Sequence, residues 1–109
     1  MAFDENAAKR VREVLSKECT VSEKRMFGGL AFMAQGHMCC GIIGQDLVIR
    51  VGASQHEQAL AEPHVRAMDF TGRSMKGFIY VSPLGYSSQA NLRKWIKRGL
   101  RFVSSLPAK

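Results

Sequence analysis

The sequence predicts an α+β domain in which helices pack on one antiparallel β-sheet to form two layers. Amphipathic helical segments lie toward both ends of the chain, and the region between them consists of short apolar runs separated by turn residues. Strands that follow one another through tight turns favour antiparallel pairing. The predicted order of elements is α-β(3)-α-β(2)-α. A length of 109 residues with 46% hydrophobic side chains suits one domain, over residues 1–109, with one core.

The first helix is predicted at residues 5–17. Opposite charges four residues apart, such as Glu5 and Lys9, support a solvent-facing side, and Asp4 is placed to cap the N-terminus. The apolar side chains recur at helical spacing and form one stripe, which consists of Ala7, Ala8, Val11, Val14 and Leu15.

Three strands are predicted between Met26 and Val51. The apolar runs in this region are interrupted by Gly36 and by residues 44–46, which are residue types typical of hairpin turns. The last strand alternates with a period of two, and this alternation places in the core Leu47, Ile49 and Val51.

A short helix is predicted over residues 54–61, before Pro63 ends it. Leu60 is expected to turn inward, whereas His56 and Glu57 are expected to face water.

Two strands and a long helix complete the chain. One extended stretch ends at residues 68–70, a glycine-bounded loop follows at residues 71–77, and residues 78–81 have the β-branched and aromatic content of a strand. The last helix is predicted to begin behind a Ser87/Ser88 cap and to stop before Pro107. Its apolar positions recur at three- and four-residue spacing and are Leu92, Trp95, Ile96, Gly99, Leu100, Val103 and Leu106.

Positive charge is concentrated in the last part of the chain. Residues 1–69 hold eight Lys/Arg and nine Asp/Glu, whereas residues 70–109 hold eight Lys/Arg and no acid, so the net charge of +7 is the sum of −1 and +8. This asymmetry predicts a basic face that could meet nucleic acid, anionic lipid or an acidic protein.

Two segments carry the candidate contact residues of this basic face. The loop at residues 71–77 contributes Arg73 and Lys76, and it alternatively serves only as a connection between strands. The last helix could present its cations to a phosphate backbone or to an acidic protein, and the alternative is an ordinary solvated helix face. These helix residues are Arg93, Lys94, Lys97, Arg98 and Arg101.

No catalytic site, cofactor or metal is predicted, and the chain is not expected to be an enzyme. The acids are scattered, and no nucleophile elbow or phosphate-binding loop is present. Gly28 and Gly29 are interpreted as relieving crowding or allowing a bulge within a packed strand. His37 and Cys39 would share one strand face while Cys40 points away, but two ligands do not make a structural zinc site. Further ligands would have to come from distant segments, namely Cys19, His56 or His64.

The chain is expected to be cytoplasmic, without a membrane partner. No apolar run approaches the roughly 18 residues that cross a bilayer, and the first residues lack the pattern of a signal peptide. Cys19, Cys39 and Cys40 are odd in number and lack CxxC spacing, so they are predicted to remain thiols in a reducing compartment.

Several separate sequence blocks match one family pattern in order. Residues 26–33 read Met-Phe-Gly-Gly-Leu-Ala-Phe-Met and residues 36–41 read Gly-His-Met-Cys-Cys-Gly. Further blocks follow at residues 50–52, 63–66, 68–73, 75–81, Trp95 and 106–109. In these blocks the chain resembles the N-terminal domain of the TfoX/Sxy family of competence regulators.

The resemblance implies a two-layer α-β(3)-α-β(2)-α fold, similar to that of type III secretion chaperones, and a role in gene regulation. TfoX-like regulators act at promoters together with the cyclic-AMP receptor protein, and full-length members carry a second, C-terminal domain. The resemblance transfers no catalytic residues. We therefore expect a non-enzymatic regulatory or adaptor domain that acts through protein contacts in transcription. The alternative is weak nucleic-acid binding, without sequence preference, through the basic C-terminal helix.

Overall fold

The computed structural model describes residues 3–26, 28–70 and 73–107, and the side chains of these except at residues 26, 69–70 and 73–75. The 3-10 turns η1 (Ala53–Gln55) and η2 (Pro83–Gly85) precede α2 and α3. The longer elements, in chain order, are α1 (Glu5–Ser16), β1 (Ser22–Met26), β2 (Gly29–Ala34), β3 (His37–Ile43), β4 (Asp46–Arg50), α2 (His56–Leu60), β5 (Val65–Phe70), β6 (Arg73–Val81) and α3 (Gln89–Ser104).

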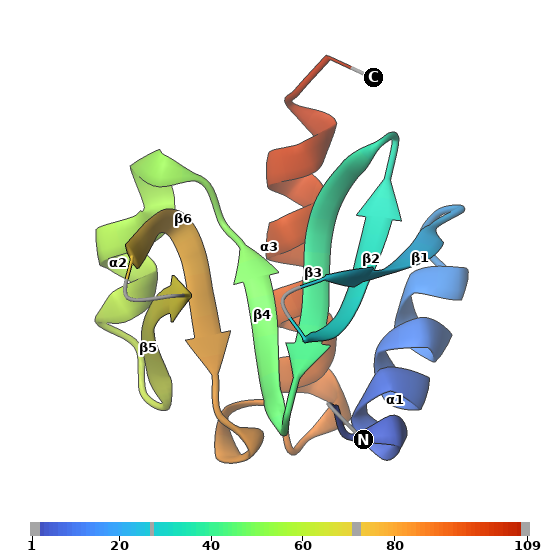
Figure 1. Cartoon of the computed structure of the whole chain (residues 1–109), viewed down its shortest axis with the longest axis horizontal. Helices are drawn as coiled ribbons and strands as arrows, with labels where there is room; N and C mark the ends of the chain where they lie inside the picture. The colour runs from blue at the N-terminus through green and yellow to red at the C-terminus, as the bar shows by residue number, and fades with distance from the viewer. Residues whose placement is uncertain (1–2, 27, 71–72, 108–109) are drawn as a thin grey trace.

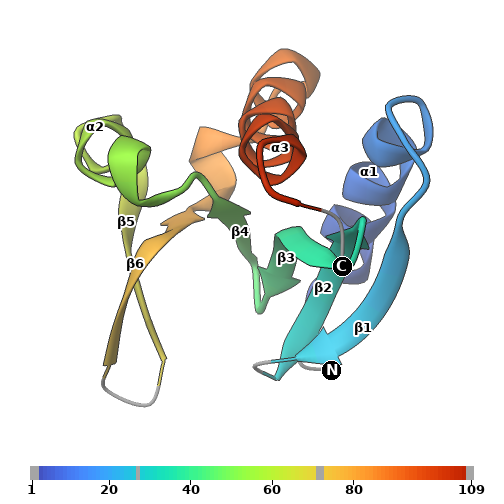
Figure 2. The ribbon, with the colours of Figure 1, turned by 90° about the horizontal axis from the view of Figure 1, so that it is seen from above.

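The strands of the described residues form one six-stranded antiparallel sheet in the order β1-β2-β3-β4-β6-β5. Helices α1 and α3 lie next to each other on one face of the sheet, and α2 lies on the same side, over the end formed by β5 and β6 (Figures 1 and 2). The predicted class, α+β with helices packed on an antiparallel sheet, is confirmed.

The structure contains one strand more than predicted before α2. This strand, β1, lies at the sheet edge and pairs with β2, with Lys24 opposite Ala31. Its residues from Ser22 to Arg25 are exposed. An exposed edge strand buries neither face fully and therefore needs no apolar alternation, so the pattern that identified the other strands was absent here.

Both long helices begin at the predicted caps. The Asp4 carboxylate accepts hydrogen bonds from the N–H groups of Asn6 and Ala7, and the Ser88 hydroxyl accepts one from the N–H of Asn91. These side chains satisfy N–H groups that a helix leaves unpaired in its first turn. No helix in the described part of the chain is long and apolar enough to span a membrane.

Helix α3 packs directly on β3 and β4. Its apolar stripe is buried, and Ile96 is fully inaccessible at the centre of the core. The approach is closest at Gly99, where a Cβ atom would lie 2.5 Å from the carbonyl oxygen of Cys39 on β3. The absence of a side chain at Gly99 therefore sets how near α3 sits to the sheet.

The sheet also buries apolar side chains on the face that carries no helix. The predicted alternation is confirmed, because Leu47, Ile49 and Val51 are buried in the helix-facing core. Val48 points to the other face and is buried as well, in a smaller cluster with Ala31, Met38 and Met68. Period-two alternation of apolar residues in one strand does not reveal this second cluster.

The prediction that His56 faces water is wrong, whereas Glu57 is exposed as predicted. Only 5% of His56 is accessible, and its Nδ1 accepts a hydrogen bond of 3.0 Å from the N–H of Gly77. The carbonyl of Gly77 accepts from the N–H groups of Val51 and Gly52. The backbone at Gly77, with φ of 93°, thus turns its N–H away from the regular ladder, and the first residue of α2 supplies the acceptor.

The predicted loop at residues 71–77 is mostly strand. Strand β6 starts at Arg73 and pairs with β5 from Phe70 opposite Arg73 onward, so these residues form the end of a β-hairpin. Thr71 and Gly72, which were included in the predicted loop, lie outside the described residues. Gly77, predicted to bound a loop, lies inside β6, where its N–H meets His56.

Candidate functional site

The exposed cations of α3 form a row along the helix. Arg93, Lys97 and Arg101 are exposed and follow one another every four residues. With a rise of about 1.5 Å per residue, consecutive members stand about 6 Å apart along the axis. The buried stripe of Leu92, Ile96 and Gly99 holds the helix on the sheet, so the row is directed away from the core.

Two other cations of α3 are tied to α2. Arg98 donates a hydrogen bond to the carboxylate of Glu62, just after α2, and Lys94 Nζ lies 3.6 Å from the other oxygen of Glu62. The guanidinium of Arg98 also stacks 4.4 Å from the centroid of the Trp95 ring, and its side chain is only 18% exposed. Arg98 therefore acts mainly in holding α2 against α3.

The row itself is only weakly neutralised within the protein. Lys97 Nζ lies 4.0 Å from Glu18 Oε2, and both side chains are partly exposed, so the attraction is small. Among the residues that the structure describes, no carboxylate lies within 4.0 Å of Arg93 or Arg101. Like charges four residues apart repel one another, and an external anion would relieve this repulsion.

A groove of about 620 Å³ runs beside the row, between α2 and α3. Arg93, Lys97 and Arg101 line it from α3, and Gln55 and Gln58 line it from η1 and α2. The Glu62 carboxylate also lines this groove, together with its partners Lys94 and Arg98. The two glutamines can each donate and accept hydrogen bonds, while the three cations supply positive charge. The sequence does not predict this arrangement, because it does not show that α2 lies beside α3 in the fold.

The two other predicted contact residues lie on a different part of the surface. Lys76 is exposed on β6, and Arg73 begins the same strand, although its side chain is outside the described part of the structure. Gly77 packs against Gly52 near the end of α3, but the hairpin before it runs outward, away from the helices (Figure 2). The structure does not join the two predicted basic segments into one contact row.

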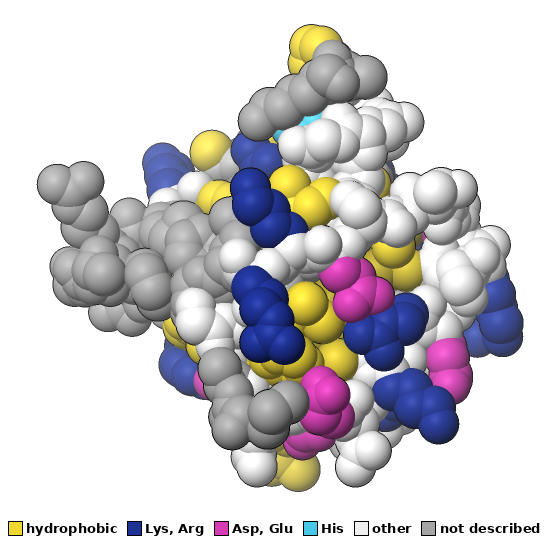
Figure 3. All heavy atoms as spheres, turned by 45° about the vertical axis from the view of Figure 1, so that its right-hand side comes forward, with side chains coloured by type: hydrophobic (Ala, Val, Ile, Leu, Met, Phe, Trp, Pro, Cys, Tyr) yellow, Lys and Arg dark blue, Asp and Glu magenta, His cyan; other side chains and the backbone are white. Residues whose placement is uncertain are grey.

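Charges of both signs are mixed on the face of the molecule that carries α1, β1 and β2. Lys and Arg side chains alternate there with Asp and Glu around exposed apolar atoms (Figure 3). Arg12 on α1 forms two hydrogen bonds with the carboxylate of Glu23 on β1, and the bonds from Arg12 lower the pKa of Glu23. This mixed surface contrasts with the cation row of α3.

The prediction that Cys40 points away from Cys39 is wrong. A register shift between Phe32 and Met33 leaves Cys39 outside the paired residues of β2 and β3, so both cysteines are buried and their sulfur atoms lie 3.8 Å apart. The Cys39 thiol donates to the carbonyl of Phe32. The hydrogen bond with the Cys39 thiol, together with burial, raises the pKa of Cys40 well above its usual value, which keeps Cys40 protonated.

His37 does not join Cys39 in a metal site. Its Nε2 lies 2.7 Å from the carbonyl oxygen of Pro107 and links the β2–β3 hairpin to the chain after α3. Within the described residues, no group of three or more His, Cys, Asp or Glu side chains could hold a metal ion.

A comparison with known protein families identifies the family to which this chain belongs. The family model of the TfoX N-terminal domain matches residues 13–103. The chain belongs to this family. The match runs from within α1 to within α3 and so includes the whole sheet, α2 and the cation row of this TfoX N-terminal domain. The search of curated proteins found no match.

Proposed function

We propose that this TfoX N-terminal domain is a non-enzymatic regulatory or adaptor module that contacts an acidic segment of a protein of the transcription machinery. The cation row of α3, bordered by the α2–α3 groove, is the observation that carries the proposal. Membership in the TfoX family supports a regulatory role. The contact residues are Arg93, Lys97 and Arg101, with Gln55 and Gln58 facing them.

The spacing of the row suits carboxylates on a polypeptide. Its steps of about 6 Å are close to the roughly 6.6 Å between alternate residues of an extended chain. An extended segment also exposes backbone N–H and C=O groups, which the amides of Gln55 and Gln58 can bind from the opposite side of the groove. Carboxylates at alternate positions could therefore meet successive cations.

The distribution of acids favours a protein over a nucleic acid. Three of the five α3 cations, Lys94, Lys97 and Arg98, lie within 4.0 Å of Glu18 or Glu62. These carboxylates would repel the closely spaced phosphates of a nucleic acid, which needs several unneutralised cations for useful affinity. A peptide can place its carboxylates at the row and neutral residues opposite Glu18 and Glu62, of which Glu62 lines the groove itself. The alternative of weak nucleic-acid binding rests on the excess of positive charge alone.

Affinity capture from cell lysate tests the proposal. The bait is the whole chain. It is compared with a row variant that carries Arg93→Gln, Lys97→Gln and Arg101→Gln. A control variant of equal charge carries Lys9→Gln, Lys17→Gln and Lys24→Gln. All six positions are exposed, so the variants should fold equally well. We expect nuclease-treated lysate to yield one specific protein that the control retains and that the row variant loses by about tenfold, as for the loss of two or three charge contacts.

The proposal fails if both triple variants retain the same proteins equally, because the row would then contribute nothing specific. It also fails if nuclease treatment abolishes all capture, and that outcome supports nucleic-acid binding instead. In that case the affinity for duplex DNA should fall with salt, with a log–log slope of about −2.7 for three phosphate contacts, and the row variant should flatten it.

A further inference from the structure

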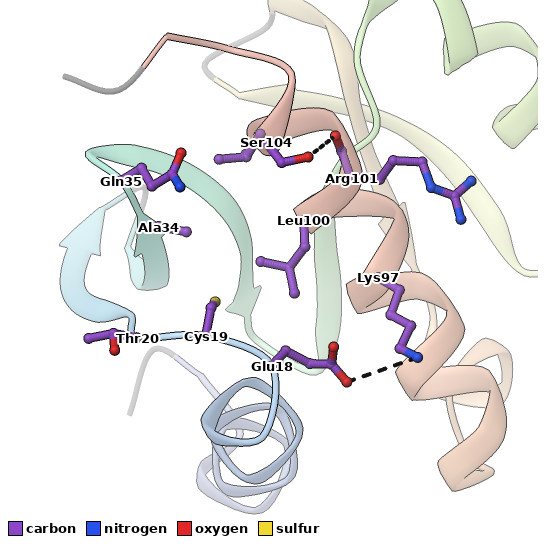
Figure 4. A pocket seen from close by; sticks show the side chains of 10 residues that line it. Glu18, Cys19, Thr20, Ala34, Gln35, Lys97, Leu100, Arg101 and Ser104 are labelled. Carbon is purple, nitrogen blue, oxygen red and sulfur yellow. Dashed lines mark hydrogen bonds and ion pairs between the residues drawn. The ribbon is translucent and has the colours of Figure 1, made fainter.

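A second hollow lies on the other side of α3, away from the α2–α3 groove. It occupies about 650 Å³ between the loop after α1, the β2–β3 turn and the last turns of α3 (Figure 4). This volume falls within the roughly 300–1,000 Å³ of small-molecule sites. Lys97 and Arg101 line both hollows and separate them.

The inner part of the hollow is apolar at Leu100, which projects into the space, and at Cys19, whose thiol is turned toward it (Figure 4). Ala34 and Val103 also line the hollow and belong to the buried core. Polar side chains, among them Thr20 and Ser104, complete the lining. An apolar ligand body that covers Leu100 displaces water from a surface that offers it no hydrogen-bond partner.

The walls are held in place by backbone contacts. The N–H groups of Glu18 and Cys19 both donate to the carbonyl of Leu15 at 3.0 Å, which fixes the loop after α1. The bond between His37 and Pro107 ties the β2–β3 hairpin to the end of α3. A preformed site costs a ligand less ordering of the protein on binding.

The rim includes the β2–β3 turn. Gln35 and Gly36, with φ of 55° and 83°, are the two central residues of this hairpin, and positive φ at both positions is typical of a tight two-residue turn. The turn places the Gln35 side chain at the rim (Figure 4). The Gln35 amide therefore adds a hydrogen-bonding group at the opposite end of the hollow from Lys97.

The charges around the hollow favour a single negative charge on the ligand. Lys97 and Arg101 are positive and Glu18 is negative, so the lining residues have a net charge of two minus one, or +1. The Lys97–Glu18 separation of 4.0 Å is too long for a strong pair, and Lys97 can still bind a ligand anion. Burial raises the pKa of the Cys19 thiol, so Cys19 adds no charge at neutral pH.

We propose that this hollow binds a small amphiphilic monoanion, with its apolar body against Leu100 and Ala34 and its carboxylate at Lys97. The proposal concerns a ligand site on the α1 side of α3 and does not depend on the protein contact proposed above. A cation would meet the net positive rim, and a short polar anion would leave the apolar interior unfilled.

Protection of Cys19 from alkylation tests this site with native residues. Cys19 is exposed and Cys39 and Cys40 are buried, so the neutral reagent iodoacetamide should add once, at Cys19, as intact-mass spectrometry would show. The probe is decanoate, below its micelle concentration. Two compounds serve as controls. Decyltrimethylammonium has a similar alkyl chain with the opposite charge, and butyrate has the same carboxylate with a much shorter chain. We expect saturating decanoate to slow alkylation at least about fivefold and the other two compounds less than about twofold, because a bound body covers the thiol.

Lys97→Gln and Lys94→Gln form a matched pair, since both lysines are exposed on α3 but only Lys97 lines the hollow. Lys97→Gln should weaken the apparent affinity for decanoate about threefold to fivefold, and Lys94→Gln should leave it unchanged. Three results would each overturn the proposal: no protection by decanoate, equal protection by decyltrimethylammonium, and equal effects of the two substitutions.

Discussion

Gly99→Ala is expected to destabilise the protein by about 1–3 kcal/mol, although alanine is the better helix former. In an exposed helix interior the same change would add about 1 kcal/mol of stability. Here the new Cβ would lie 2.5 Å from the carbonyl oxygen of Cys39, which is backbone of a central strand and cannot rotate away. Helix α3 would have to move outward and lose contact along its buried stripe.

Urea unfolding followed by far-UV circular dichroism measures this effect. Asn91→Ala is the matched control, because Asn91 is exposed on the same helix and its side chain packs against no core element. The control should change the free energy of unfolding by no more than about 0.5 kcal/mol. A Gly99→Ala protein that is as stable as the wild type would show that α3 does not approach β3 as closely as described.

His56→Ala is expected to lower the free energy of unfolding by about 1–3 kcal/mol. The substitution leaves the N–H of Gly77 buried without an acceptor and also empties the space of the imidazole. Glu57→Ala, at the exposed neighbouring position of α2, should have little effect. Thermal or urea unfolding of the three proteins provides the comparison.

His56→Asn separates the hydrogen bond from the lost volume. The Oδ1 atom of asparagine branches at the same point as Nδ1 of histidine, so it can accept from Gly77 while filling less space. It should recover part of the stability lost in His56→Ala. Equal losses in the alanine and asparagine variants would mean that the bond to Gly77 contributes nothing and that packing alone explains the effect.

The sequence predicted the elements whose signals are local. Helix caps at Asp4 and Ser88, the stripe of the last helix and the alternation of residues 47–51 each depend on neighbours within a few positions, and all are present in the structure. Strand β1 was missed because an exposed edge strand has no apolar period. The crowding expected at Gly29 is confirmed, since a Cβ there would lie 2.2 Å from the carbonyl oxygen of Ile42. The same expectation is wrong for Gly28, which is an exposed turn residue with φ of 74° and, beyond its chain neighbours, no described atom within 4 Å of the position of a Cβ.

The features that were mispredicted or missed depend on contacts between distant segments. His56 is buried because Gly77, 21 residues later, presents an N–H to it. Cys40 shares the side of Cys39 because of a register shift that arises from pairing with β2. The residues around His56 or around the cysteines do not identify these partners. The prediction therefore depended on two local rules, namely that polar side chains face water and that side chains alternate along a strand.

The sequence identified residues of the candidate site, but it did not show how they are arranged. Arg93, Lys97 and Arg101 were identified from their charge and spacing, and the structure places them beside one groove. Spacing could not reveal that Glu62 engages Lys94 and Arg98, because Glu62 comes from another element. A carboxylate brought in by the fold thus engages Arg98 and the still exposed Lys94, and it leaves Arg93, Lys97 and Arg101 as a row.

In-cell photo-crosslinking from the α2–α3 groove tests the central claim most directly. A benzophenone amino acid replaces Gln58, which lines the groove opposite the row, and a control protein carries it at Lys24, on the exposed edge strand. The account predicts a protein adduct from position 58 that is absent from position 24 and that disappears when Arg93, Lys97 and Arg101 are changed to Gln. Three results would contradict the account: identical adducts from both positions, adducts with nucleic acid alone, and a position-58 adduct that persists in the row variant.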